Sequence, residues 1–144
     1  MEKGIQLMFL FQQDMVMLNI SLSFSISFKL IAKEFKPDLV LASVGFDIYE
    51  GDPLGGMSVT PDGFAGLTRI LMEIARSSCD SKLVLTLEGG YNLQGLRDSV
   101  KSVLKELREE STIKGRDWSD KQNQRILAPV LDKVKSIQGK YWKI

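Results

Sequence analysis

Two short apolar runs, each followed by a glycine-rich loop, restrict the folds open to this chain. The first is Asp38–Ser43 (DLVLAS) and the second is Lys82–Leu87 (KLVLTL). Nearly continuous apolar runs are typical of strands covered on both faces of a parallel sheet. A helical pattern follows each run, and the order strand, helix, strand, helix predicts parallel strands joined by a right-handed crossover. We therefore predict an α/β fold whose sheet is incomplete, because two or three strands are too few to be covered on both faces.

Capping residues and apolar spacing locate the helices. Thr60 followed by Pro61 suits the N-cap and first position of a helix. Its expected apolar face consists of Phe64, Leu67, Leu71 and Ile74. Asn92 is placed to cap a helix with an apolar stripe of Leu93, Leu96, Val100, Val103, Leu104 and Leu107. We also expect a short helix to end at Phe35, a surface loop over 111–119 and a last helix over 124–141.

Residues 1–31 differ from the α/β region, which we assign to residues 32–144. Residues 15–28 carry no charge, but this stretch is shorter than the roughly 20 residues that a membrane helix needs. No signal-peptide cleavage pattern follows it. Apolar side chains alternate with Asn and Ser over 18–28, which predicts a single amphipathic strand. We expect residues 1–28 to pack less regularly than the rest.

Composition excludes several classes of function. The 144 residues carry 19 basic and 18 acidic side chains, with no basic block of the kind that nucleic-acid binders carry. We therefore expect neither nucleic acid nor membrane as a direct partner. Cys79 is the single cysteine, which favours a reducing compartment, the cytoplasm, or the nucleus in a eukaryote. The chain has no histidine, so it cannot alone perform chemistry that requires one.

Both strands end in loops that carry polar side chains. Asp47 and Asp52 follow the first strand, and Glu88 and Tyr91 follow the second. Ligand sites of parallel sheets form beyond the carboxyl ends of the strands. An aspartate there can ligate a cation, and a tyrosine can donate to a developing oxyanion. The residue types alone favour a structural interpretation, because Asp and Gly are common in turns and a zinc site needs about three protein ligands.

Five motifs in one order carry a family resemblance. They are Phe35–Leu41 (FKPDLVL), Gly45–Asp47 (GFD), Gly51–Gly56 (GDPLGG), Val59–Pro61 (VTP) and Leu83–Leu93 (LVLTLEGGYNL). The set resembles the carboxyl-terminal part of the histone deacetylase family, in particular its class II-like and prokaryotic members. The resemblance covers roughly Ile31 to the C-terminus. It implies a partial arginase-like parallel sheet with flanking helices, about the carboxyl-terminal half of the family domain.

The resemblance also implies an activity and roles for single residues. The family uses Zn²⁺ to hydrolyse the amide of N-acetyl-lysine or related acyl-amines. Asp47 aligns with the last of three zinc ligands, and Tyr91 aligns with the tyrosine that polarises the amide carbonyl. The positions that match the acyl channel are Gly89 and Gly90 beside the site and Leu54 near its rim. The residues that look like loop-holding positions are Asp52, Glu88 and Asn92.

One departure from the family pattern bears on activity. The family places an aspartate and a histidine ligand, and a pair of water-activating histidines, upstream of these motifs, and this chain has no histidine. We therefore expect a truncated deacetylase that is inactive alone. The alternative is a non-catalytic interaction module that keeps the half-fold and can self-associate through the unfinished sheet edge. A nucleotide-binding domain fits poorly, because the loop Glu88–Asn92 lacks a phosphate-binding signature.

Overall fold

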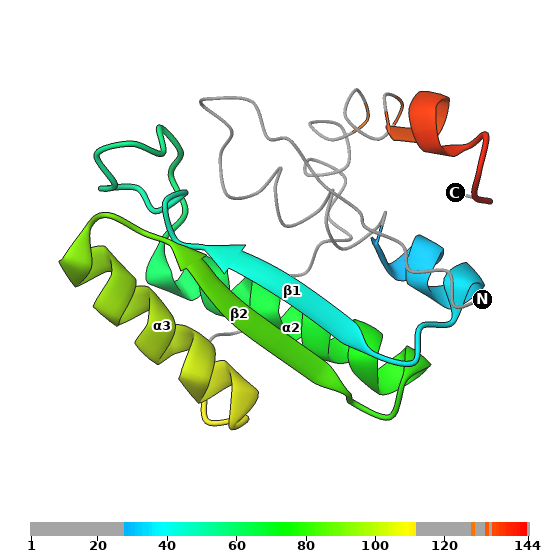
Figure 1. Cartoon of the computed structure of the whole chain (residues 1–144), viewed down its shortest axis with the longest axis horizontal. Helices are drawn as coiled ribbons and strands as arrows, with labels where there is room; N and C mark the ends of the chain where they lie inside the picture. The colour runs from blue at the N-terminus through cyan, green and yellow to red at the C-terminus, as the bar shows by residue number, and fades with distance from the viewer. Residues whose placement is uncertain (1–27, 112–127, 129–131, 133, 144) are drawn as a thin grey trace.

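The computed structural model describes residues 28–111, 128, 132 and 134–143. After a helix over 28–35, the order is β1 (Val40–Gly45), α2 (Pro61–Ser78), β2 (Leu83–Gly89) and α3 (Leu93–Leu107), as Figure 1 shows. The two strands pair in parallel, with a register that starts at Val40 opposite Leu83. This arrangement confirms the predicted α/β class with parallel strands.

Both strands end two residues later than the apolar runs predict. The first strand also begins two residues later, at Val40, and the second begins one residue later, at Leu83. The ladder continues to Gly45 opposite Gly89, after an irregularity in register. The Phe46 N–H then donates to the Gly89 carbonyl over 2.8 Å. Glu88 and Gly89 therefore belong to β2, and the loop that we expected to start at Glu88 starts at Gly90. Backbone pairing, which polar and glycine residues can continue, explains the extension.

The predicted caps hold α2 and α3 at their N-termini. Thr60 Oγ1 accepts from the Gly63 N–H over 3.1 Å, and Asn92 Oδ1 accepts from the Gly95 N–H over 2.9 Å. Of the four predicted apolar residues of α2, Phe64, Leu71 and Ile74 are buried and Leu67 is half-buried. The capping and amphipathic signals for α2 are therefore confirmed.

The two ends of the described chain meet beside α2. Helix 28–35 packs through Ile31, which is 2% exposed, and Lys29 pairs with Glu73 of α2 over 2.5 Å. The Phe35 and Trp142 rings contact edge to face at 6.4 Å, and the backbone N–H of Lys143 donates to Glu34. Residues 128, 132 and 134–138 are helical, whereas residues 139–141 form turns, so the predicted last helix ends three residues earlier than expected.

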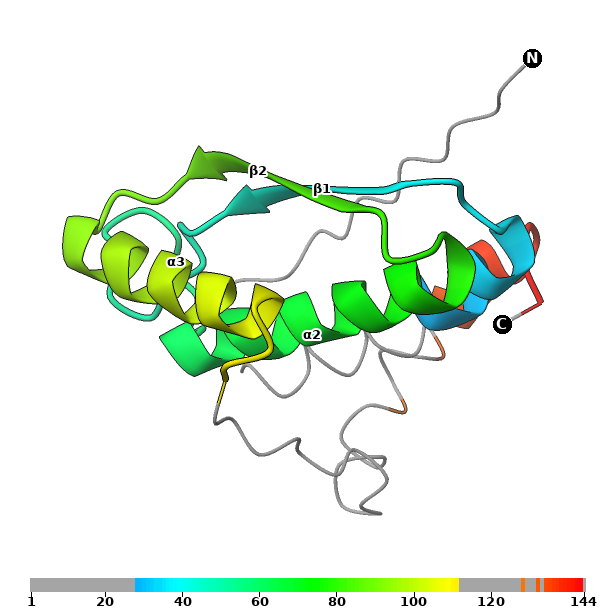
Figure 2. The same ribbon diagram turned by 90° about the horizontal axis from the view of Figure 1, so that it is seen from below.

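Helices α2 and α3 lie on the same face of the sheet (Figure 2). The core between them is a cluster of Phe46, Met57, Val59, Phe64 and Val103. On the other face of the sheet Leu41 is 65% and Val84 is 44% exposed. In the described part of the chain one face of the two-stranded sheet is therefore open, which agrees with the predicted incomplete sheet. Successive side chains of a strand point to opposite faces, and described helices cover one of them.

The apolar stripe predicted for α3 is only partly its buried face. Val103 is buried, but Leu93 and Leu104 are 79% and 54% exposed. The buried face consists of Gly95, Ser99, Val103 and Glu106. Small residues and the ion pair between Arg69 and Glu106 set this contact with α2, so α3 is rotated and most of its leucines turn away from the core.

Several expectations fall outside the described residues. They are the amphipathic strand over 18–28 and the irregular packing of residues 1–28, except for residue 28, which begins a helix instead, and nearly all of the loop over 111–119. None of the helices that the structure describes has the length and apolar character needed to cross a membrane.

Candidate active-site edge of the sheet

The carboxylate of Asp47 lies over the ends of both strands. A Cβ built on Gly45 would lie 2.7 Å from Asp47 Oδ1, and one on Gly89 would lie 3.4 Å from Asp47 Oδ2. Asp47 follows β1 by two residues, and its own carbonyl oxygen lies against Gly55, where a Cβ would be 1.5 Å away. Glycine at positions 45 and 55 therefore leaves the space in which the Asp47 carboxylate and its loop lie, whereas a Cβ at position 89 would make an ordinary contact.

Asp52 joins the two loops. Its Oδ1 accepts from the N–H groups of Leu54 and Gly55, at 2.9 and 3.2 Å. Its Oδ2 accepts from the N–H groups of Tyr91 and Asn92, at 2.7 and 3.1 Å. The first pair is a local turn of the kind that aspartate forms with its own backbone. The second pair crosses to the loop after β2 and holds it against the loop after β1.

This bonding changes the acidity of Asp52. Partial desolvation raises the pKa of its carboxyl, but the four backbone N–H donors together outweigh it and lower the pKa below the ordinary value of 3.8. Hydrogen bonds to the charged form favour that form. Asp52 is therefore an ionised carboxylate whose acceptor sites are used for structure, which agrees with the loop-holding role predicted for it.

Asn92 and Tyr49 add to the same junction. Asn92 Nδ2 donates to the Gly51 carbonyl over 2.7 Å, while its Oδ1 caps α3. The Tyr49 ring lies so close to Gly95 that a Cβ there would be 2.4 Å from it. The N-terminus of α3 is thereby fixed against the loop after β1.

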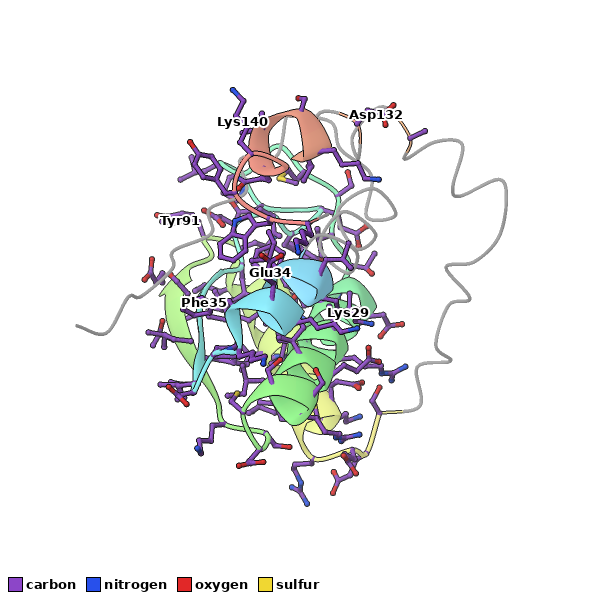
Figure 3. All side chains as sticks on the ribbon, turned by 90° about the vertical axis from the view of Figure 1, so that its right-hand side faces the viewer. Lys29, Glu34, Phe35, Tyr91, Asp132 and Lys140 are labelled. Atoms are coloured by element: carbon purple, nitrogen blue, oxygen red, sulfur yellow. The ribbon has the colours of Figure 1, made fainter. Side chains whose placement is uncertain are left out.

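Tyr91 lies at the outside of this edge (Figure 3), and its side chain is 59% exposed. Gly90 before it has a φ of +134°, and a Cβ there would lie 2.9 Å from the Cβ of Phe46. Glycine meets both requirements, the positive φ and the close approach. Leu54, the predicted rim residue, is 71% exposed, and Glu88 is exposed on β2 without a loop-holding contact of its own.

The described residues do not fit a zinc site by themselves. Among them no group of three or more His, Cys, Asp or Glu side chains is placed to hold a metal ion. A catalytic zinc takes about three protein ligands. Asp47 offers one carboxylate, both oxygens of Asp52 are engaged by backbone N–H groups, and the whole chain lacks histidine.

The structure brings the predicted residues to one edge and adds others. Asp47, Gly89, Gly90, Tyr91 and Leu54 all belong to the carboxyl ends of β1 and β2 or their loops. The contact of Tyr49 with Gly95, and the close approach of Gly55 to Asp47, were not predicted. The glycines in GDPLGG and at the start of α3 were the available signal, but only folded loops show what each glycine accommodates.

A model of the histone deacetylase domain matches residues 3–107 of this sequence. The chain belongs to the histone deacetylase family. The match begins within the N-terminal segment, earlier than the start near Ile31 that the motifs predict. It ends at Leu107, the last residue of α3.

Curated relatives are much longer than this deacetylase-family chain. It is 48% identical over 85 residues to histone deacetylase 18 of Arabidopsis thaliana, covering 59% of this chain and 12% of the relative. It is 38% identical over 112 residues to histone deacetylase HDA1 of Saccharomyces cerevisiae, covering 78% of this chain and 15% of the relative. The chain therefore spans less than a fifth of the length of these relatives.

Solved structures match the fold. The structure of the histone deacetylase Clr3 superposes with a TM-score of 0.75 at 30% identity, covering 92% of this chain and 21% of that one. The crystal structure of the HDA15 HD domain superposes with a TM-score of 0.67 at 32% identity, covering 88% of this chain and 33% of that one. The fold is thus a part of the arginase/deacetylase sheet with its helices.

Proposed function

We propose that this chain supplies the carboxyl-terminal part of a zinc-dependent histone deacetylase domain. Together with the rest of such a domain, it would hydrolyse the amide of N-acetyl-lysine or a related acyl-amine. The observation that carries the proposal is the bonding of Asp52 to the Tyr91 and Asn92 backbone, because it holds the loops of Asp47 and Tyr91 at one edge of the sheet.

We assign the chemistry at this edge to two side chains. The Tyr91 hydroxyl donates a hydrogen bond to the amide oxygen as negative charge develops on it, and such a donor is commonly worth about 10²–10³ in rate. The Asp47 carboxylate is one ligand of the Zn²⁺ expected from the family. Gly89 and Gly90 leave an open passage for the acyl chain, and Leu54 lies near its rim.

We infer that the chain does not catalyse alone. The base that activates water at neutral pH is usually a histidine in sites of this kind, and the chain has none. The remaining metal ligands must come from the upstream part of the domain.

A chimera tests the proposal. Residues 28–111 replace the matching segment of histone deacetylase clr3 of Schizosaccharomyces pombe, which is 36% identical to this chain over 113 residues. We expect zinc-dependent deacetylation of an acetyl-lysine peptide, lost in Asp47→Asn and reduced at least about 100-fold in Tyr91→Phe. Tyr49→Phe, which changes a packing tyrosine, is the matched control. A folded but inactive chimera, or activity unaffected by Tyr91→Phe, would contradict the assignment.

The alternative function is a non-catalytic interaction module that acts in the cytoplasm or nucleus. The exposed apolar side chains of the sheet and of α3 favour it. Metal analysis of this chain bound to the rest of a deacetylase domain distinguishes the two functions. One tightly bound zinc per complex supports the deacetylase, and a complex without zinc supports the interaction module.

A further inference from the structure

The ring of Tyr49 fills space that two glycines leave on different segments. A Cβ built on Gly95, in the first turn of α3, would lie 2.4 Å from two atoms of the ring. A Cβ built on Gly51, in the loop after β1, would lie 2.9 Å from the ring. Cβ atoms in folded proteins do not approach other atoms this closely, so an added methyl group would displace the ring or the backbone. We call the contact of Tyr49 with Gly51 and Gly95 the Tyr49 wedge.

Backbone bonds and core packing hold the segment that carries the ring. Tyr49 forms an isolated bridge with Val59, a buried residue of the core cluster. The Glu50 N–H donates to the Val59 carbonyl over 3.1 Å, and the Val59 N–H donates to the Ile48 carbonyl over 3.0 Å. The Tyr49 side chain is half-buried and packs against the same core cluster. The ring therefore has fixed neighbours besides the two glycines.

The wedge lies directly beside the residue that follows Tyr91. Asn92 is the N-cap of α3, and its Oδ1 accepts from the Gly95 N–H over 2.9 Å. The Asn92 Nδ2 donates to the Gly51 carbonyl over 2.7 Å. The two glycines that contact the Tyr49 ring are thus the two backbone partners of the Asn92 side chain. A shift of the wedge moves Asn92, and with it the backbone from which the Tyr91 side chain extends.

We propose that Tyr49 is a positioning residue for the candidate active site. Its ring sets the separation between the loop after β1 and the first turn of α3, and so sets where the Tyr91 hydroxyl meets the amide oxygen. Asp52 holds the Tyr91 backbone by hydrogen bonds, whereas Tyr49 supports the adjoining helix by packing. A misplacement of about 1 Å at a catalytic group can lower a rate about 10²-fold, so such support affects turnover. This inference rests on the proposed function, which assigns oxyanion donation to Tyr91.

Paired variants in the chimera with clr3 test the effect on turnover. We expect Tyr49→Ala to lower kcat about five-fold or more without a matching rise in KM, because the hydroxyl is displaced while the surface that binds substrate is kept. Gly95→Ala should lower kcat as well, because its Cβ displaces the ring. The double variant should have a higher kcat than Gly95→Ala, since the Cβ has room once the ring is gone. Tyr49→Phe keeps the ring and should restore the kcat of the parent chimera.

The full chain of 144 residues tests the fit without any activity. Gly95→Ala should lower the midpoint of urea unfolding in the parent chain but not in the Tyr49→Ala background, because substitutions of residues in contact are not additive. Tyr49→Ala should also quicken hydrogen exchange of the Tyr91 amide relative to the amides of β1, whereas Tyr49→Phe should leave it unchanged. If Gly95→Ala does not fold, a folded double variant supports the fit, and a double variant that also fails to fold overturns it.

The outcomes separate this inference from the proposed function. Additive effects of Tyr49→Ala and Gly95→Ala on stability, or unchanged exchange of the Tyr91 amide, overturn the inference. An active chimera in which Tyr49→Ala keeps kcat, or raises KM alone, overturns it too. An inactive chimera contradicts the proposed function, and coupled stabilities with faster Tyr91 exchange then still support the place that the ring gives to Tyr91.

Discussion

A single carboxylate organises the candidate site at the residue scale. The two loops come from strands that are neighbours in the sheet but are 39 residues apart at the contact of Asp52 with Tyr91. Parallel pairing alone brings the loops to one edge, and the four N–H groups bonded to Asp52 fix how they lie there. Asp52 therefore acts on Tyr91 by positioning its backbone.

We predict that Asp52→Asn loosens the loop after β2. The amide replaces one oxygen with an NH₂ group, which cannot accept from two of the four N–H donors. The melting temperature should fall by several degrees, and hydrogen exchange of the Tyr91 and Asn92 amides should quicken. Asp38→Asn, at an exposed carboxylate in the described chain, is the control. Unchanged exchange at residues 91 and 92 would show that Asp52 does not hold the loop.

Substitution of two adjacent glycines by alanine should change the unfolding free energy by different amounts. Gly90 has a φ of +134° and no room for a Cβ, so Gly90→Ala should cost about 2–3 kcal/mol of unfolding free energy. At Gly89 the nearest atom to a Cβ is Asp47 Oδ2 at 3.4 Å, an ordinary contact. Gly89→Ala should therefore fold nearly as well as the parent chain. Denaturant titration checks both, and equal losses would contradict the assignment.

At the scale of elements, a half-buried ion pair joins α2 and α3. Arg69 Nε and Nη2 donate to the two oxygens of Glu106 at 2.7 and 2.9 Å, and the Glu106 side chain is 7% exposed. Desolvation raises the pKa of Glu106, but the hydrogen bonds from Arg69 and Ser111 outweigh it and lower the pKa below its ordinary value of 4.5. The same pair raises the pKa of Arg69.

We predict that Glu106→Gln weakens the contact between α2 and α3. It should lower the unfolding free energy by about 2 kcal/mol, because Arg69 keeps its charge in a half-buried place without a carboxylate. The matched control is Glu109→Gln, which removes the exposed pair with Arg76 and should cost less than about 0.5 kcal/mol. Equal effects in urea titrations would contradict a special role for Glu106.

The same pair predicts a dependence of stability on pH. Because the pKa of Glu106 is lower in the folded chain than in the unfolded chain, its contribution is complete above pH 4.5. It is lost as the pH falls from 4.5 through the lowered folded pKa. Stability curves from pH 6 to 3 should therefore be flatter in Glu106→Gln than in the parent chain. Parallel curves would show that Glu106 titrates normally.

At the scale of the whole molecule, the described residues form a two-stranded sheet that helices cover on one face only.

We predict that the purified chain does not deacetylate an acetyl-lysine peptide when Zn²⁺ is added, because one candidate ligand and one oxyanion donor do not make a hydrolytic site. After dialysis, metal analysis should find less than one zinc ion bound per chain. Zinc-dependent turnover that is lost in Tyr91→Phe would show that the chain assembles a complete site.

Local sequence signals were enough for the elements and for part of the site. Thr60, Pro61 and Asn92 marked helix starts because capping depends on a few neighbouring residues. The apolar runs marked the strands, although their ends shifted, since pairing of β1 with β2 also includes Gly45, Glu88 and Gly89. The motifs around Asp47 and Tyr91 identified the family and the residues worth testing.

Only the tertiary structure decided which apolar residues are core. Leu93 and Leu104 share a stripe with Val103 in the sequence, but the contact of Arg69 with Glu106 orients α3 so that Val103 is buried and both leucines remain exposed. The junction made by Asp52 likewise joins residues 39 apart, through an oxygen whose partners no local pattern specifies. The sequence by itself determined what each segment forms, because those preferences are local. The rotation of a helix and the meeting of two loops depend on contacts between distant segments, and these exist only once the chain has folded.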